Sequence, residues 1–177
     1  MRKIYIILIL SLISSFSAIS QVTLKIDKAE ILLPKEAIKL TKNERNSIFY
    51  KKFNVEDIVG EGPADNCYNI DGMLLELYSS KLNGNRNFLD QIKTGQENRI
   101  KRLHLKANSY ETKIEDLNGY KALINKKSSE ISNHYSFFLV NKDFSYAVTG
   151  ILYFLPSEEQ KAKAVIYKIL NNIKILN

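Results

Sequence analysis

The sequence predicts an α+β domain in which a central antiparallel sheet is flanked by helices, and three patterns lead to this prediction. Alternating apolar and polar runs meet at Asn118-Gly119, the type of dipeptide that most strongly favours a tight hairpin. Two segments, residues 87–105 and 157–173, carry apolar side chains at helical spacing. Residues 145–154 are apolar on both strand faces, which is typical of a strand in the middle of a sheet with a layer on each side.

The first half of the chain is expected to be mostly extended. Residues 22–26 alternate and predict a strand, and residues 31–33 predict a second strand that ends at Pro34, because proline cannot donate to a ladder. Residues 43–53 mix charged with aromatic side chains, a pattern that fits a strand or a short helix and does not decide between them. Residues 73–79 predict the next strand.

A helix and two hairpins are expected to follow. Residues 87–105 predict the first long helix, whose last turn is basic and so complements the helix dipole. Residues 110–117 and 120–124 predict the hairpin around Asn118-Gly119, and residues 135–140 and 145–154 predict a second one.

The chain is expected to end in a helix over residues 157–173. Ser157 begins the sequence Ser-Glu-Glu-Gln, a capping box in which the Ser157 hydroxyl and the Gln160 side chain would satisfy amides at the helix start. Apolar residues form one broad face of this helix and lysines fill the opposite face, so it should pack on the sheet.

The first twenty residues have the order of a secretory signal. Arg2 and Lys3 precede an apolar core at residues 4–13, and small residues at positions 18 and 20 predict cleavage before Gln21. The core is shorter than the roughly 20 apolar residues of a membrane-spanning helix. We therefore expect a signal peptide at 1–20, a single domain at 21–177 and a periplasmic or secreted protein; an uncleaved N-terminal anchor is the alternative.

Charge and cysteine content narrow the class of protein. Without Arg2 and Lys3 the chain has 24 basic and 19 acidic residues, so its net charge falls from +7 to +5. This mild excess favours anionic surfaces or an acidic protein, and nucleic acid is not expected for an exported chain. Cys67 is the only cysteine, so no disulfide forms within the chain, and it is expected to be a small buried apolar residue.

Three segments, together with the order of elements, carry a resemblance to a known family. They are Ile31-Leu-Leu-Pro34, Leu117-Asn-Gly-Tyr120 and the terminal helix. The chain resembles the PsbP-like superfamily of α-β-α sandwich proteins, which includes many exported bacterial proteins. The resemblance implies a non-catalytic module that binds or supports a partner; it carries no catalytic motif onto this chain and implies no cofactor.

Candidate chemistry is sparse. Cys67 with His104 or His134 could form a nucleophile and base, but no motif surrounds the cysteine. An EF-hand frame starting at Asp65 fails, because its third and sixth positions are occupied by Cys67 and Ile70, where an oxygen ligand and a glycine are needed.

The acidic loop at 57–71 is interpreted as solvated, although some calcium affinity stays open, and the basic run 100–106 as the charged end of a helix. No catalytic, cofactor or metal residue is predicted.

We expect an exported, non-enzymatic module that binds another envelope or secreted protein, with membrane contact only through the signal peptide before its cleavage. Two alternatives are kept. One is an immunity-type protein that neutralises a toxin in the periplasm, and the other is a small-ligand carrier or weak hydrolase that uses the loop around Cys67.

Overall fold

The computed structural model describes residues 22–53, 66–102, 109–129 and 133–176. The predicted signal peptide, the cleavage site and most of the acidic loop lie outside these ranges. The elements in chain order are β1 (Val22–Ile26), β2 (Ala29–Leu33), β3 (Ala37–Lys39), α2 (Lys42–Ile48), a π-helical turn (Phe49–Phe53), β4 (Cys67–Ile70), β5 (Met73–Lys81), α3 (Phe88–Arg102), β6 (Tyr110–Leu117), β7 (Tyr120–Lys127), β8 (Asn133–Val140), β9 (Tyr146–Phe154), a 3₁₀ turn (Pro156–Glu158), α4 (Glu159–Leu170) and β10 (Ile173–Ile175).

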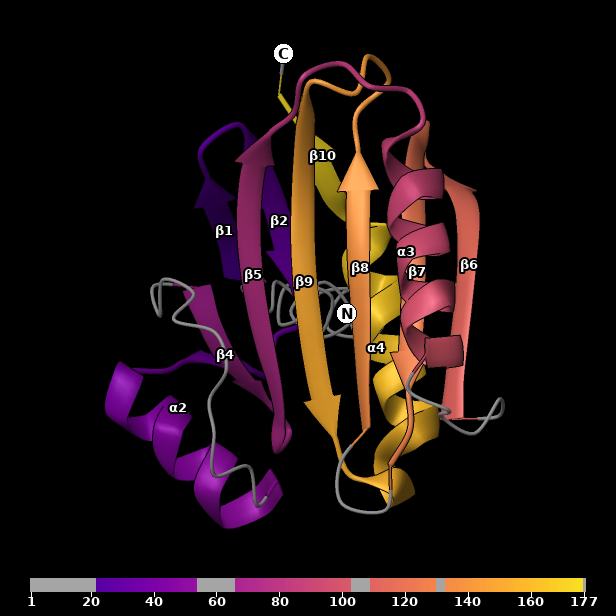
Figure 1. Ribbon diagram of the computed structural model, residues 1–177. Helices are drawn as coiled ribbons and strands as arrows, with labels where there is room; N and C mark the ends of the chain where they lie inside the picture. Colours follow the sequence, from indigo (N-terminus) through magenta and orange to yellow (C-terminus); the bar gives the residue numbers. More distant parts are fainter. Residues whose placement is uncertain (1–21, 54–65, 103–108, 130–132, 177) are drawn as a thin grey trace, which may run out of the picture.

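The predicted antiparallel platform is confirmed as a seven-stranded sheet of order β3-β4-β5-β9-β8-β7-β6 (Figure 1). Both predicted hairpins form, β6–β7 around Asn118-Gly119 and β8–β9. Asn118 and Gly119 have φ values of 51° and 83°, the left-handed conformation that this turn needs. Strand β9, predicted to be central, lies between β5 and β8.

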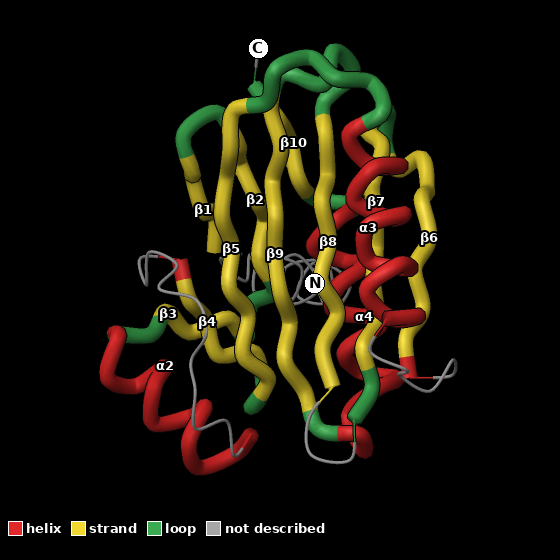
Figure 2. The backbone as a smooth tube through the Cα atoms, in the orientation of Figure 1, coloured by secondary structure: helices red, strands yellow, loops and turns green. Residues whose placement is uncertain are grey.

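The two faces of the large sheet are covered by different layers. On one face, α4 and a second sheet of order β1-β2-β10 enclose one continuous apolar core. On the other face, α2 with the π-helical turn covers one cluster and α3 covers another (Figure 2). The fold is therefore α+β with layers on both sides of the sheet, as predicted, but the first two strands belong to a separate small sheet.

Gly150 in β9 is a point of close packing in the core. A Cβ atom at this position would lie 2.4 Å from Phe137 Cε1 and 2.9 Å from Leu77 Cδ2. Such distances are too short for real contacts, so a glycine here lets the Phe137 ring cross the central strand.

Residues 43–53, for which the sequence pattern fitted either a strand or a short helix, are helical. Helix α2 has a capping box at its start, since Thr41 Oγ1 accepts from the Glu44 N–H at 3.3 Å and Glu44 Oε2 accepts from the Thr41 N–H at 2.8 Å. The capped helix continues into the π-helical turn, whose Phe49 and Phe53 fill the cluster beneath it.

The prediction for the chain end is wrong in two respects. The Ser157–Gln160 capping box does not form, because the carboxylate of Glu158 accepts from the Leu155 N–H at 2.8 Å and so moves the cap two residues upstream. The helix ends at Leu170, and Ile173 lies in β10, where it pairs with Ile31 of β2. Tertiary pairing overrides the helical spacing at this point.

A buried ion pair joins α2 to β5. Arg45 and Glu76 are each 4% exposed, and Arg45 Nε donates to Glu76 Oε1. The Tyr78 hydroxyl donates to Glu76 Oε2 at 2.9 Å, and the guanidinium lies 5.2 Å from the centre of the Phe49 ring. Both oxygens of the carboxylate are thus satisfied, as a charge buried at this depth requires.

Removing one member of this pair should be costly. We expect Glu76→Leu to lower the free energy of unfolding by about 3–5 kcal/mol, because Arg45 is left buried without a counter-charge, and the double variant Arg45→Met/Glu76→Leu to recover most of that loss. Urea unfolding measures both. The control is Glu30→Leu in the exposed Lys25–Glu30 pair, which should change the free energy of unfolding far less, because solvent screens an exposed pair. Equal losses in the two single variants would contradict the role of the buried pair.

Candidate functional site

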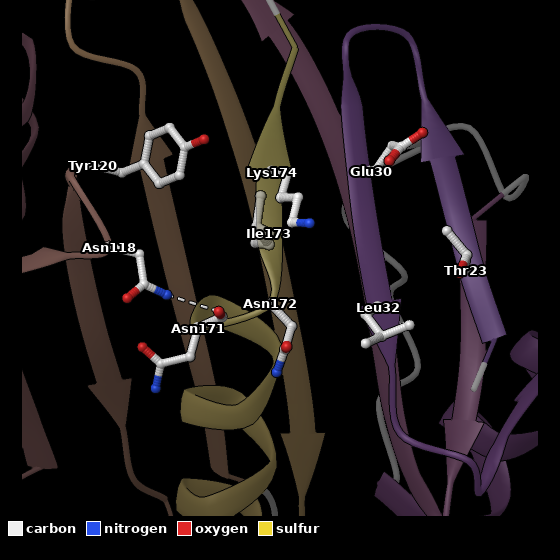
Figure 3. A pocket seen from close by; sticks show the side chains of 9 residues that line it. All are labelled: Thr23, Glu30, Leu32, Asn118, Tyr120, Asn171, Asn172, Ile173 and Lys174. Atoms are coloured by element: carbon white, nitrogen blue, oxygen red, sulfur yellow. Dashed lines mark hydrogen bonds between the residues drawn. The ribbon is translucent and has the colours of Figure 1, made fainter. Parts of the chain in front are cut away.

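An open groove of about 470 Å³ lies between the small sheet and the β6–β7 turn (Figure 3). In Figure 3, Asn118 and Tyr120 of the turn lie on one side, Ile173 and Lys174 of β10 lie in the middle, and the residues of β2 and β1 lie on the other side, with Asn171 and Asn172 at the end of α4. The lining residues are Thr23, Glu30, Leu32, Asn118, Tyr120, Asn171, Asn172, Ile173 and Lys174.

Two hydrogen bonds hold the sides of the groove in place. Asn118 Nδ2 donates to the carbonyl oxygen of Asn171 at 2.7 Å, which ties the hairpin turn to the end of α4 (Figure 3). The Ile175 N–H donates to Tyr120 Oη at 3.0 Å, which ties the same hairpin to β10. The groove therefore has a defined width.

The groove combines three carboxamides with charged side chains and the aliphatic side chain of Leu32. Asn172 Nδ2 donates to the Lys168 carbonyl at 2.7 Å, and the Asn171 side chain makes no hydrogen bond to another described residue. Its carboxamide is therefore available as both a donor and an acceptor. Glu30 and Lys174 face each other across the β2–β10 ladder, and a hydrogen bond from Lys25 lowers the pKa of Glu30.

Strand β10 adds backbone groups to the groove. The Leu32 N–H donates to the Asn172 carbonyl, and the Leu176 N–H donates to the Lys28 carbonyl. The backbone N–H and C=O groups of residues 172, 174 and 176 therefore point toward β2. By strand alternation the N–H and C=O of Ile173 point away from β2, toward the groove side. The Ile175 N–H already donates to Tyr120 Oη, so the outward-facing backbone groups of Ile173, together with the carboxamides and the Leu32 side chain, are what the groove offers to an extended polypeptide.

The structure does not bring Cys67 and His134 together. They lie on β4 and β8, with β5 and β9 between them, which corresponds to roughly 14 Å at about 4.8 Å per strand. Cys67 is 2% exposed, and burial raises the pKa of its thiol to about 12. His104 lies outside the described residues. A dyad of Cys67 with His134 is thus excluded by position, and the predicted burial of Cys67 is confirmed.

The acidic loop is described only in part. Asp57, Glu61 and Asp65 lie outside the described residues, while Asp71 pairs with Lys161 at 3.1 Å. Two further residues of the rejected EF-hand frame have structural partners: Asn69 Oδ1 accepts from the Gly72 N–H at 2.7 Å, and Glu76 pairs with Arg45. Within the described ranges, no three His, Cys, Asp or Glu side chains cluster as a metal site would require.

The basic run 100–106 is also described only in part. Residues 100–102 form the last turn of α3, as the interpretation of a charged helix end requires, and residues 103–106 lie outside the described ranges. In the part of the chain that the structure describes, no helix has the length and apolar character needed to span a bilayer.

The groove itself was not predicted. Its amide residues come from two places 53 positions apart in the chain, and only the Asn118 turn has a local signal. The helix was predicted to end at residue 173, but it ends at Leu170, just before Asn171 and Asn172. The local sequence pattern therefore did not indicate that these two residues lie beside the turn.

Comparison with solved structures identifies the fold. The chain is similar to cyanobacterial PsbP (CyanoP) from Synechocystis sp. PCC 6803, whose solution structure aligns with a TM-score of 0.53 over 88% of this chain and 91% of that chain, at 11% sequence identity. The fold is therefore PsbP-like, as the resemblance implied. No protein-family model matches the chain, and no curated protein is similar to it by sequence.

The buried thiol gives a first test of this description. At pH 8 the thiolate fraction of a group with a pKa of about 12 is on the order of 10⁻⁴, so we expect Cys67 to be unreactive in the native protein. Labelling with a chromogenic disulfide reagent should become rapid only in urea, in step with unfolding monitored by circular dichroism. Fast labelling of the native protein would contradict the described burial and would support a reactive cysteine.

His134 gives a second test. Burial, together with nearby Lys127, lowers its pKa from 6.5 to about 4, and its ring lies 5.6 Å from that of Tyr153. Between these two pH values the unfolded chain binds a proton that the folded chain does not. The free energy of unfolding should therefore fall by about 2–3 kcal/mol as the pH drops from 6.5 to 4.

Urea unfolding of the wild type and of His134→Gln across this pH range isolates the effect. The His134→Gln variant should lose this pH-dependent change in the free energy of unfolding and keep the changes that the carboxylates cause. Burial raises the pKa of Tyr153, so this residue keeps its proton throughout the window and does not contribute to the difference. Identical pH dependence in the two proteins would show that His134 titrates normally.

Proposed function

We propose that this chain is an exported, non-catalytic module that binds a partner protein of the cell envelope through the groove between the small sheet and the β6–β7 turn. The observation that carries the proposal is the lining of that groove, which offers carboxamides, aliphatic side chains and an outward-facing strand edge. These are the groups that recognise an extended segment of another polypeptide.

The remaining chemistry supports a binding role. Three described groups of the kinds that take part in catalysis have structural surroundings: Cys67 is buried and protonated, Glu76 is paired with Arg45, and His134 is uncharged at neutral pH. None of these lines the groove. The order of basic, apolar and small residues at 1–20 supports export.

The shape of the groove favours a short extended segment over a flat protein surface. Its two sides are held by the Asn118–Asn171 and Tyr120–Ile175 hydrogen bonds, so it is largely formed before a partner binds. A pre-formed site loses little conformational entropy on binding, which favours affinity from a small contact area.

The proposal is tested by a matched pair of variants. Leu32→Asp places a charge in the groove on a side chain that is outside the apolar core, and Ile38→Asp places the same charge on an aliphatic residue, 66% exposed, in β3 away from the groove. Capture from an envelope extract of the source organism identifies a candidate partner. Calorimetry with that purified partner should give at least about tenfold weaker binding for Leu32→Asp and unchanged binding for Ile38→Asp.

Two results would overturn the proposal. One is that no protein bound by the wild type loses affinity in Leu32→Asp. The other is an equal loss in Ile38→Asp. Unfolding in urea checks that both variants keep the stability of the wild type, so that a loss of binding is not a loss of folding.

A further inference from the structure

The sequence contains two Asn-Gly dipeptides, Asn83-Gly84 and Asn118-Gly119, and a leucine precedes each of them. In such a dipeptide the glycine nitrogen can attack the side-chain carbonyl of the asparagine, because glycine has no Cβ to block the approach. This reaction makes asparagine a chemically labile residue. All four residues are exposed, so neither exposure nor the preceding residue distinguishes the two dipeptides.

The first dipeptide is held in place by its hydrogen bonds. The Gly84 N–H donates to the Phe144 carbonyl at 2.9 Å. Asn83 Oδ1 accepts from the Asn85 N–H at 3.2 Å. The nitrogen that would attack and the carboxamide that would be attacked are therefore both engaged.

The second dipeptide is held more loosely, because it forms the tip of the β6–β7 turn. The Gly119 N–H makes no hydrogen bond to another described residue, and a Cβ at Gly119 would have no atom of a non-adjacent residue within 4 Å. The Asn118 side chain is held by one bond, from Nδ2 to the Asn171 carbonyl at 2.7 Å (Figure 3). Reaction at Asn118 thus breaks one of these hydrogen bonds, whereas reaction at Asn83 breaks two.

We propose that Asn118 is a site of spontaneous deamidation that weakens the binding of a partner in the groove; the effect on binding rests on the proposed function. The Gly119 nitrogen loses its proton to solvent and forms a bond to Cγ of Asn118. The Cγ–Nδ2 bond breaks, and Nδ2 takes up a proton and leaves as ammonia. Water, the only co-reactant, then opens the five-membered imide at either carbonyl and yields aspartate or isoaspartate.

The product no longer ties the turn to the end of α4. A carboxylate cannot donate to the Asn171 carbonyl, so a hydrogen bond is replaced by a contact between two acceptors. An isoaspartate also adds one methylene to the backbone of a two-residue turn, whose length sets the register of β6 and β7. The next residue, Tyr120, accepts from the Ile175 N–H of β10, so a displaced turn loosens this second tie as well.

The two asparagines can be compared within one sample. Purified protein is incubated at mildly alkaline pH with and without guanidinium chloride. Mass spectrometry then follows the tryptic peptides 82–86 and 114–121, which separate the two dipeptides. In the native protein we expect Asn118 to deamidate at least about fivefold faster than Asn83, as one fewer hydrogen bond to break predicts. In denaturant the two rates should agree, because both dipeptides follow a leucine.

Matched variants test the effect on the groove in the absence of a partner. Asn118→Asp carries the charge of the product, and Asn83→Asp carries the same charge outside the groove. Hydrogen exchange of the Ile175 N–H, followed by NMR, should be at least about fivefold faster in Asn118→Asp and unchanged in Asn83→Asp. The partner protein captured from the envelope extract should bind Asn118→Asp about tenfold more weakly than the wild type.

Each part of the proposal has an outcome that overturns it. Equal native rates at the two asparagines, or a faster rate at Asn83, overturn the site of deamidation. Unchanged exchange of the Ile175 N–H in Asn118→Asp overturns the loosening of the groove.

Binding separates this proposal from the proposed function. If Leu32→Asp loses the partner and Asn118→Asp keeps it, the effect of deamidation on binding is overturned and the groove remains the binding surface. If neither variant loses the partner, the proposed function fails and the effect on binding fails with it, whereas the site of deamidation is decided by the measured rates alone.

Discussion

The architecture depends on the burial of β9 on both faces. This strand lies between β5 and β8, and its apolar side chains alternate without a polar face. A strand of this kind must be covered by a layer on each side, because an exposed apolar face would cost the free energy that its burial provides. Gly150 adds a second constraint, since the absence of a side chain there admits the Phe137 ring of β8 into the core.

The two covering layers meet this requirement in different ways, and the difference determines where the groove lies. On one side, α4 and the small sheet enclose a continuous core, and their junction with the β6–β7 hairpin forms the groove. On the other side, α2 and α3 cover separate clusters. The sheet beneath α3 therefore carries polar and charged residues along one row, Tyr110–Lys127–His134, instead of a purely apolar surface.

The sequence was informative where structure is decided by neighbours along the chain. The Asn118-Gly119 hairpin, the central position of β9 and the two long helices follow from turn chemistry and periodicity. The position of Ile173 in a strand does not follow from local pattern. Its spacing continues the apolar face of α4, while its pairing partner, Ile31, is more than a hundred residues away. The groove has the same character: its defining hydrogen bond joins Asn118 to Asn171, a contact that no local pattern encodes.

The similarity to cyanobacterial PsbP at 11% identity concerns the arrangement of layers, and it is compatible with almost any surface. A fold of this kind needs apolar side chains that cover the central strand, and many different combinations of apolar side chains do this equally well. What is particular to this chain lies outside that core, in the carboxamides of Asn118, Asn171 and Asn172 beside β10. The proposed binding of a partner therefore rests on this groove and not on the fold that the chain shares with cyanobacterial PsbP.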